Sequence, residues 1–276
     1  MHPAGEKERN LPCRQLMRTA ALAPMCWNIC RMNCVLSWNR TVSFMISACM
    51  GRTCCFITML PSPTRWVHWA MPCTRSRGGS FLTGRAGGAL RGRPDAALAY
   101  ALGFVCHFAL DSTCHPYVEQ FTRESGVTHC EIETEFDNML LRRDGYDPLK
   151  FFTASHIHPS EQNAKAIAPF YEGISEQVAL DSLKGMISVH RLLQASNPVK
   201  RWVVLTGMKV VGKYDMLHGL VADPQPNPKC VESGKRLEEL YAQALPLAET
   251  LILEFVAKLD TDEPLDKAYD HTFGEF

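Results

Sequence analysis

The pattern of apolar and polar positions changes sharply along the chain. From residue 95 onward, apolar residues recur at helical intervals, and Pro, Gly and capping residues separate one run from the next. The pattern predicts helices over residues 95–121, from 128 toward 145, and over 160–170, 175–193, 198–211 and 232–259. Since no alternating strand pattern competes, the sequence predicts an all-α, multi-helix bundle.

The first two predicted helices carry distinct local signals. Residues 95–121 are rich in Ala, Leu and Phe on all sides, which is typical of a helix buried on most faces, and Pro116 should end or kink it. The second helix begins at a capping box, in which Thr128 and Glu131 can satisfy the first free amides. We therefore expect a buried helix followed by a second, amphipathic one.

Residues 1–94 have a different character. No Asp or Glu occurs from Arg9 to Pro94, and eight of the twelve cysteines lie in this part. A zinc module or a nucleic-acid-binding tail is disfavoured, because the cysteines lack paired C-x2-C spacing and the segment lacks an amphipathic period. We predict an irregular arm over 1–94 and a helical domain over 95–276.

Codon degeneracy suggests a reason for this contrast. If the third base of each codon is read with the first two of the next, Met45–Ile46 requires Asp, Met50–Gly51 requires Gly, and Cys54–Cys55 requires Leu. The shifted frame permits H-G-P-D within residues 45–58 and A-M-H near Cys73. The hypothesis is that residues 1–94 are translated in the wrong reading frame.

Bulk composition excludes several classes of protein. The 276 residues are enough for one large core, the net charge is zero and the pI is about 7.1, so the overall charge does not favour nucleic acid or an anionic membrane. No apolar run is expected to reach the roughly 18 residues of a membrane span, since His107 interrupts the best stretch. The first ten residues lack the pattern of a secretory signal, which leads us to expect a cytoplasmic protein.

Five residues share a spacing that is typical of a metal site. His107, Asp111 and His115 follow each other at four-residue steps on one helix face, and His129 and Glu133 repeat the step. Imidazole and carboxylate are ligands of zinc. Each His/carboxylate pair could also be an ordinary contact within a helix. Two such pairs favour a metal site, because His107 and Asp111 lie within an apolar stretch where unsatisfied polar groups are costly.

Other residues near this pattern are better explained by packing. Cys106, Cys114 and Cys130 flank the five residues and could coordinate zinc, but free Cys is commonly a small buried apolar residue. His218 could line a pocket, yet a lone His beside Leu and Met is more often satisfied within the core. None of these four is included in the predicted site.

The segment H-F-A-L-D-S-T-C-H-P followed by H-C-E-I-E resembles the zinc-dependent phospholipase C family, whose fold is all-α and shared with the S1/P1-type nucleases. The resemblance implies up to three zinc ions. It assigns His115, His129 and Glu133 to one site, and His107 and Asp111 to a second, with Asp111 bridging to a third. The family also has an early His, an Asp and another His, which are absent from residues 1–94 as written, so fewer ions are expected here.

The resemblance implies that the function is zinc-dependent hydrolysis of a phosphate ester without a covalent enzyme intermediate. The favoured substrate is a phospholipid-type phosphodiester. The catalytic base is not identified, because the family places it in the part that is unreadable here. The missing ligands imply an impaired enzyme. The alternatives are a nuclease or nucleotidase of the same fold, or a helical protein that binds zinc without catalysis. We expect a small-molecule or lipid phosphate ester as partner and no nucleic acid, because neither stacking aromatic residues nor a basic groove stands out after residue 95.

Overall fold

The computed structural model describes residues 95–171, 173–259, 261 and 263–270, and these residues form helices and connecting loops without a strand. The α-helices are α8 (Asp95–Ser125), α9 (His129–Arg143), α10 (Glu161–Ile167), α11 (Glu176–Leu193), α12 (Pro198–Val210), α13 (Tyr214–Leu217) and α14 (Val231–Lys258). Short 3-10 helices are η2 (Thr153–His156), η3 (Ala168–Phe170), η4 (His218–Leu220), η5 (Pro228–Cys230) and η6 (Lys267–Asp270). The all-α prediction is confirmed for this part of the chain, whereas the predicted arm over 1–94 lies outside the described residues.

The predicted helix starts agree with the structure because each depends on a local signal. The side chains of Ser160, Ser175 and Asn197 accept hydrogen bonds from the first free amides of α10, α11 and α12. The short α13 and the 3-10 helices carry no such long periodic pattern, and the sequence did not predict them. Long elements with capping residues could therefore be read from the sequence, and short connecting turns could not.

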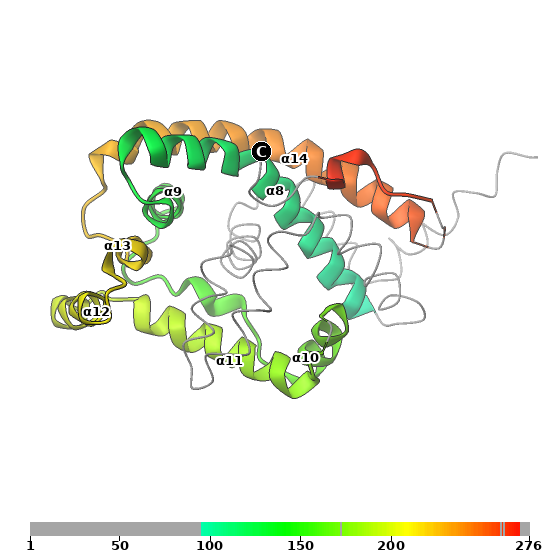
Figure 1. The fold of residues 1–276 in the computed structure, drawn as a ribbon, viewed down its shortest axis with the longest axis horizontal. Coiled ribbons are helices and arrows are strands. Elements are labelled where there is room, and N and C mark those ends of the chain that lie inside the picture. Colours follow the sequence, from blue (N-terminus) through cyan, green and yellow to red (C-terminus); the bar gives the residue numbers. More distant parts are fainter. Residues whose placement is uncertain (1–94, 172, 260, 262, 271–276) are drawn as a thin grey trace, which may run out of the picture.

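The longest helix, α8, forms the centre of the fold together with α14. It continues through Pro116 rather than ending there, and Figure 1 shows that its direction changes along its length. Alanines such as Ala101 and Ala248 are buried between the two helices, where small side chains allow a close approach, and Phe108 stacks on Tyr269 at 5.5 Å between ring centroids. This packing explains why α8 is apolar on most faces.

The start of α9 is pinned by contacts that the sequence predicted only in part. The Thr128 hydroxyl accepts from the Glu131 amide at 3.3 Å, as the capping box requires. The Glu131 carboxylate, however, accepts from the Asn227 side chain at 2.7 Å and lies 3.7 Å from His218. A Cβ on Gly219 would lie only 2.5 Å from the Glu131 nitrogen, so η4 can approach α9 this closely only with glycine.

Two helices are long and apolar enough, by length and composition alone, to cross a membrane: Ala96–Ser125 and Pro228–Lys258. The sequence-based expectation that no apolar run is long enough for a membrane span therefore does not hold for these two helices. In the first helix 67% of the most apolar window is buried inside the fold, and in the second 33%. Helices that form the core of a folded domain also pass this test, so the finding is weak evidence for a membrane span.

Candidate metal centre

Three of the five predicted ligands lie on one face of α8 and are buried. His107, Asp111 and His115 are exposed by 0%, 3% and 8%. Oδ2 of Asp111 lies 3.5 Å from Nε2 of His107 and 3.5 Å from Nδ1 of His115. It nevertheless accepts no hydrogen bond from any residue that the structure describes, which leaves a buried carboxylate oxygen between two imidazole rings. Such an oxygen is costly to bury without a compensating cation or proton.

The remaining two predicted ligands come from the first turns of α9. Nε2 of His129 lies 2.8 Å from Oε1 of Glu133, and the same oxygen lies 3.7 Å from Nε2 of His115 on α8. One donor atom from each of these three residues falls within 4.8 Å of the other two. The structure therefore joins the two four-residue patterns into one cluster across the α8 and α9 helices.

A sixth residue, Glu119, belongs to this arrangement, although the sequence analysis missed it. Its Oε1 lies 3.0 Å from Nδ1 of His129, on the opposite side of the ring from Glu133. A carboxylate in this place accepts the proton on Nδ1 and leaves Nε2 available as a ligand. The signal was present in the sequence, because Glu119 continues the four-residue steps of His107, Asp111 and His115.

Burial moves the pKa values of the two innermost groups in opposite directions. Loss of hydration and, to a smaller extent, the nearby His115 lower the pKa of His107 to about 3. Loss of hydration also raises the pKa of Asp111 to about 7, with His115 opposing that rise. Near neutral pH, His107 is thus neutral, the form in which an imidazole binds metal, while Asp111 retains part of its proton unless a cation takes the proton's place.

The outer pair behaves as an ion pair in the metal-free protein. Burial opposes ionisation of Glu133, but the adjacent rings of His129 and His115 outweigh it and lower the pKa of the carboxyl to about 2. Burial likewise opposes protonation of His129, and its two carboxylate neighbours outweigh burial and raise the pKa of the imidazole. A metal ion at this position would replace the Nε2 proton of His129, so binding would release a proton.

The geometry of the cluster fits a zinc ion. Two ligands of one tetrahedral zinc lie about 3.3 Å apart, given zinc–ligand bonds of about 2.0–2.1 Å. The 2.8 and 3.7 Å separations from Glu133 to His129 and His115 fall on either side of this value. His107 and Asp111, at 3.5 Å, form a second pair of suitable donors, but they belong to no group of three mutually close donors among the described residues.

The other residues weighed from the sequence lie outside the cluster. His218 donates from Nδ1 to the Tyr214 carbonyl at 2.9 Å and faces Glu131 with Nε2, so its contacts serve to hold η4 against α9. Burial raises the pKa of the Cys114 thiol to about 12, and its sulfur is not among the grouped donor atoms. Cys106 and Cys130 are buried and are not among the grouped donor atoms.

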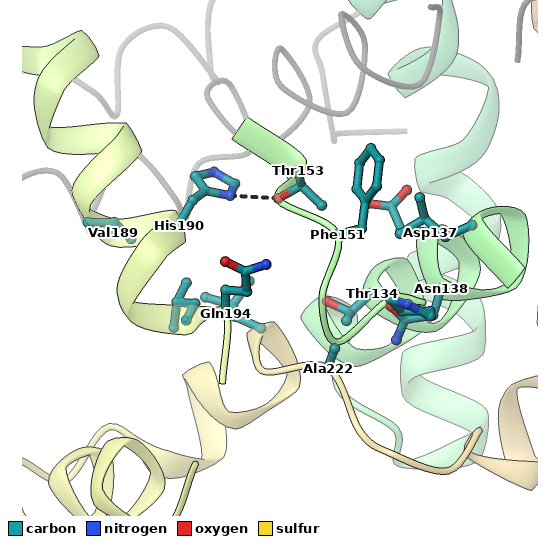
Figure 2. A pocket seen from close by; sticks show the side chains of 13 residues that line it. Thr134, Asp137, Asn138, Phe151, Thr153, Val189, His190, Gln194 and Ala222 are labelled. Carbon is teal, nitrogen blue, oxygen red and sulfur yellow. Dashed lines mark hydrogen bonds between the residues drawn. The ribbon is translucent and has the colours of Figure 1, made fainter. Parts of the chain in front are cut away.

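A pocket lies along α9, and no residue of the cluster lines it. It begins at Thr134, the residue after Glu133, and includes Asp137, which is one helical turn beyond Glu133 on the same face. Figure 2 shows Asp137 near Phe151, with His190 of α11 and Gln194, which follows that helix, across the pocket. The His190 ring is hydrogen-bonded to the Thr153 hydroxyl at 3.1 Å. The cavity measures about 120 Å³, and Asp137 is the single carboxylate among the described residues that line it.

These features define an all-α protein with a His/carboxylate cluster between two helices that could hold a metal ion. Comparison with family models gives a match to the family described as zinc dependent phospholipase C over residues 67–179, a range that contains the whole cluster and begins upstream of Asp95. Residues 67–179 therefore match the zinc-dependent phospholipase C family, as the motifs within this range indicated. No curated protein matches the chain, and no solved structure does.

Proposed function

We propose that the domain is a zinc-dependent hydrolase of phosphate esters whose substrate is a phospholipid-type phosphodiester. The observation that carries the proposal is the grouping of His115, His129 and Glu133 within 4.8 Å in a domain of a zinc-dependent family. When bound, zinc lowers the pKa of water and neutralises charge that builds on the phosphoryl oxygens. The chain's own residues bind and orient that ion and keep the site dry.

Each residue of the cluster has a distinct part in this mechanism. The rings of His115 and His129 and the carboxylate of Glu133 hold the ion from two rigid helices, which fixes their separation. Glu119 orients His129 by accepting its Nδ1 proton. Asp111 and His107 extend the donor set deeper into α8, where buried Phe104 packs edge-on against His107 and excludes water.

The pocket along α9 is the proposed position of the part of the ester that does not react. Its carboxylate, Asp137, favours a cationic group over a free phosphate, because opposite charges attract strongly at a partly dry surface. Thr134, Asn138 and Gln194 add neutral hydrogen-bonding groups around it. A phosphodiester with a cationic alcohol, such as a choline phospholipid, matches both the cluster and the pocket.

The activity of the chain as written is proposed to be weak. His107 and Asp111 supply two donors of the second site, and the family's amino-terminal His, Asp and His do not occur in residues 1–94 as printed. Sequencing independent DNA across the codons of residues 12–95 tests the reading-frame hypothesis. An insertion or deletion that restores H-G-P-D and A-M-H supports it, and a confirmed printed frame refutes it.

A second candidate function is zinc binding without catalysis. It is favoured by the same observation that the described residues complete one three-donor group and only a pair of donors at the second position. In that case zinc acts as a structural ion between α8 and α9, and its removal lowers the melting temperature while no ester is hydrolysed.

One set of measurements separates these functions. Zinc binding by calorimetry and hydrolysis of a choline phospholipid are measured for the wild type, His115→Ala, His129→Ala and the control His158→Ala, whose ring is exposed outside the site. Hydrolysis that requires zinc and is lost with His115 and His129, but not with His158, supports the phospholipase. Binding without hydrolysis supports the structural ion, hydrolysis of single-stranded DNA instead supports a nuclease, and absence of zinc binding refutes the metal site.

A further inference from the structure

The α12 helix is apolar on the side that faces the fold and also on the side that faces water. Val204 and Met208 are buried, and they pack with Ala195, Leu217 and Val221 in a small core. In the described fold, α12 lies at the edge of the molecule beyond α13, so only its inner side is covered (Figure 1).

Four apolar residues are exposed on the outer side of α12. They recur at steps of three, four and seven residues, which places them on one side of the helix. They are Val199 (69% exposed), Trp202 (66%), Val203 (54%) and Val210 (81%), and Val211 (64%) and Met216 (40%) are exposed after the helix end. We call these six residues the α12 stripe. Exposed apolar side chains grouped in this way on a folded domain are typical of an interaction surface.

The charge around the α12 stripe is basic. The segment 191–223 contains five Lys and Arg residues and two Asp residues, a net charge of +3, although the whole chain is neutral. The α12 helix itself contains no acidic residue. Arg201 is paired with Asp223, whereas Lys209 is exposed beside Val210 and lies over the Tyr214 ring. The surface therefore combines exposed apolar side chains with an excess of positive charge.

We propose that the α12 stripe docks on the surface of a lipid bilayer that contains anionic lipids, with the Trp202 ring entering the interface. Helices with apolar and aromatic residues on one side and Lys or Arg nearby bind at such interfaces, and Trp is enriched there because its ring is apolar and its N–H is polar. The expectation of no anionic-membrane binding, which was drawn from the neutral total charge, does not apply to this local surface.

Charge also distinguishes the bilayer from two other occupants. A second copy of the chain, packed through the same face, would bring two surfaces of charge +3 together. The upstream part of the chain offers no neutralisation either, because residues 9–94 contain no Asp or Glu. An anionic bilayer supplies both the apolar phase and the opposite charge.

Sedimentation of the full chain with lipid vesicles tests the proposal. Vesicles of phosphatidylcholine with a minor share of phosphatidylserine are compared with phosphatidylcholine alone, in the presence of a chelator so that neither zinc nor hydrolysis affects the result. Trp202→Ala is expected to weaken binding by about tenfold, because one large apolar side chain no longer enters the interface. Val203→Asp is expected to abolish binding, whereas Val231→Asp, at a similarly exposed valine on α14, leaves it unchanged.

The outcomes are distinct. Binding that requires phosphatidylserine, falls with salt, is weakened by Trp202→Ala and is lost in Val203→Asp supports the proposal. It is overturned if the wild type does not sediment with vesicles, if Val203→Asp and Val231→Asp behave alike, or if Val203→Asp instead dissociates an oligomer seen without lipid. Circular dichroism checks that each variant folds, and Lys209→Glu, with an expected loss of binding to anionic vesicles, replaces Val203→Asp if that variant does not fold.

Discussion

Removal of Glu119 offers the sharpest test of how the metal centre is organised. The residue binds no metal in the proposed arrangement, yet its carboxylate lies 3.0 Å from Nδ1 of His129 and determines which ring nitrogen carries the proton. Without it, His129 can rotate or place its proton on Nε2, the nitrogen that faces Glu133. We therefore expect weaker zinc binding in Glu119→Ala although all three ligands remain.

The size of the effect follows from the exposure of the carboxylate. Loss of such a supporting carboxylate typically reduces metal affinity by about 10–100-fold. The Glu119 side chain is 44% exposed, so water screens its interaction and can partly replace it. The lower end of the range applies, which is about tenfold in the dissociation constant, or roughly 1.4 kcal/mol. Glu119→Gln keeps an acceptor without the charge and should fall between the wild type and Glu119→Ala.

The assay is a competition titration of zinc against a chromophoric chelator, with the ring nitrogens of His129 followed by NMR. Glu124→Ala is the matched control, since Glu124 lies on the same helix and its carboxylate is bonded to Gln120 rather than to the cluster. Equal zinc affinity in Glu119→Ala and Glu124→Ala would refute the orienting role. An unchanged His129 tautomer in Glu119→Ala would refute the reason given for it.

Two further predictions concern stability. In the zinc-free protein, the lowered pKa of His107 destabilises the fold as the pH falls below about 6.5, while the raised pKa of Asp111 opposes this down to about 4. Below about pH 4, protonation of His107 and of Glu133, whose pKa is lowered to about 2, favours unfolding. The free energy of unfolding, measured with denaturant, should therefore fall steeply with pH in this range, and His107→Leu should reduce the slope by up to about 1.4 kcal/mol per pH unit. Equal slopes in the wild type and the variant would contradict this. Gly219→Ala places a Cβ 2.5 Å from the Glu131 backbone and should lower the free energy of unfolding by about 1–3 kcal/mol. In contrast, a Cβ on the helical Gly207 meets nothing within 4 Å, so Gly207→Ala should be neutral or stabilising by up to about 1 kcal/mol. Similar melting temperatures for the two variants would refute the close contact at Gly219.

The sequence alone determined the features that depend on neighbours within one segment. Thr128, Ser160 and Ser175 mark helix starts because a side-chain oxygen reaches an amide two or three residues away in any fold. The four-residue spacing on α8 placed His107, Asp111 and His115 on one face for the same local reason, since helix geometry sets it. The family motif is also a local pattern, and the match over residues 67–179 agrees with it.

Only the tertiary structure decided which segments meet. The distance from His115 to Glu133, and the contact of Glu119 with His129, depend on how α9 packs beside α8, which no periodicity encodes. The Glu131 carboxylate was expected to cap the start of α9, but it accepts a hydrogen bond from the Asn227 side chain at 2.7 Å, in a loop distant in sequence. The exposure of the α12 stripe is likewise a tertiary property, because an apolar residue looks the same in a sequence whether a neighbouring helix covers it or not.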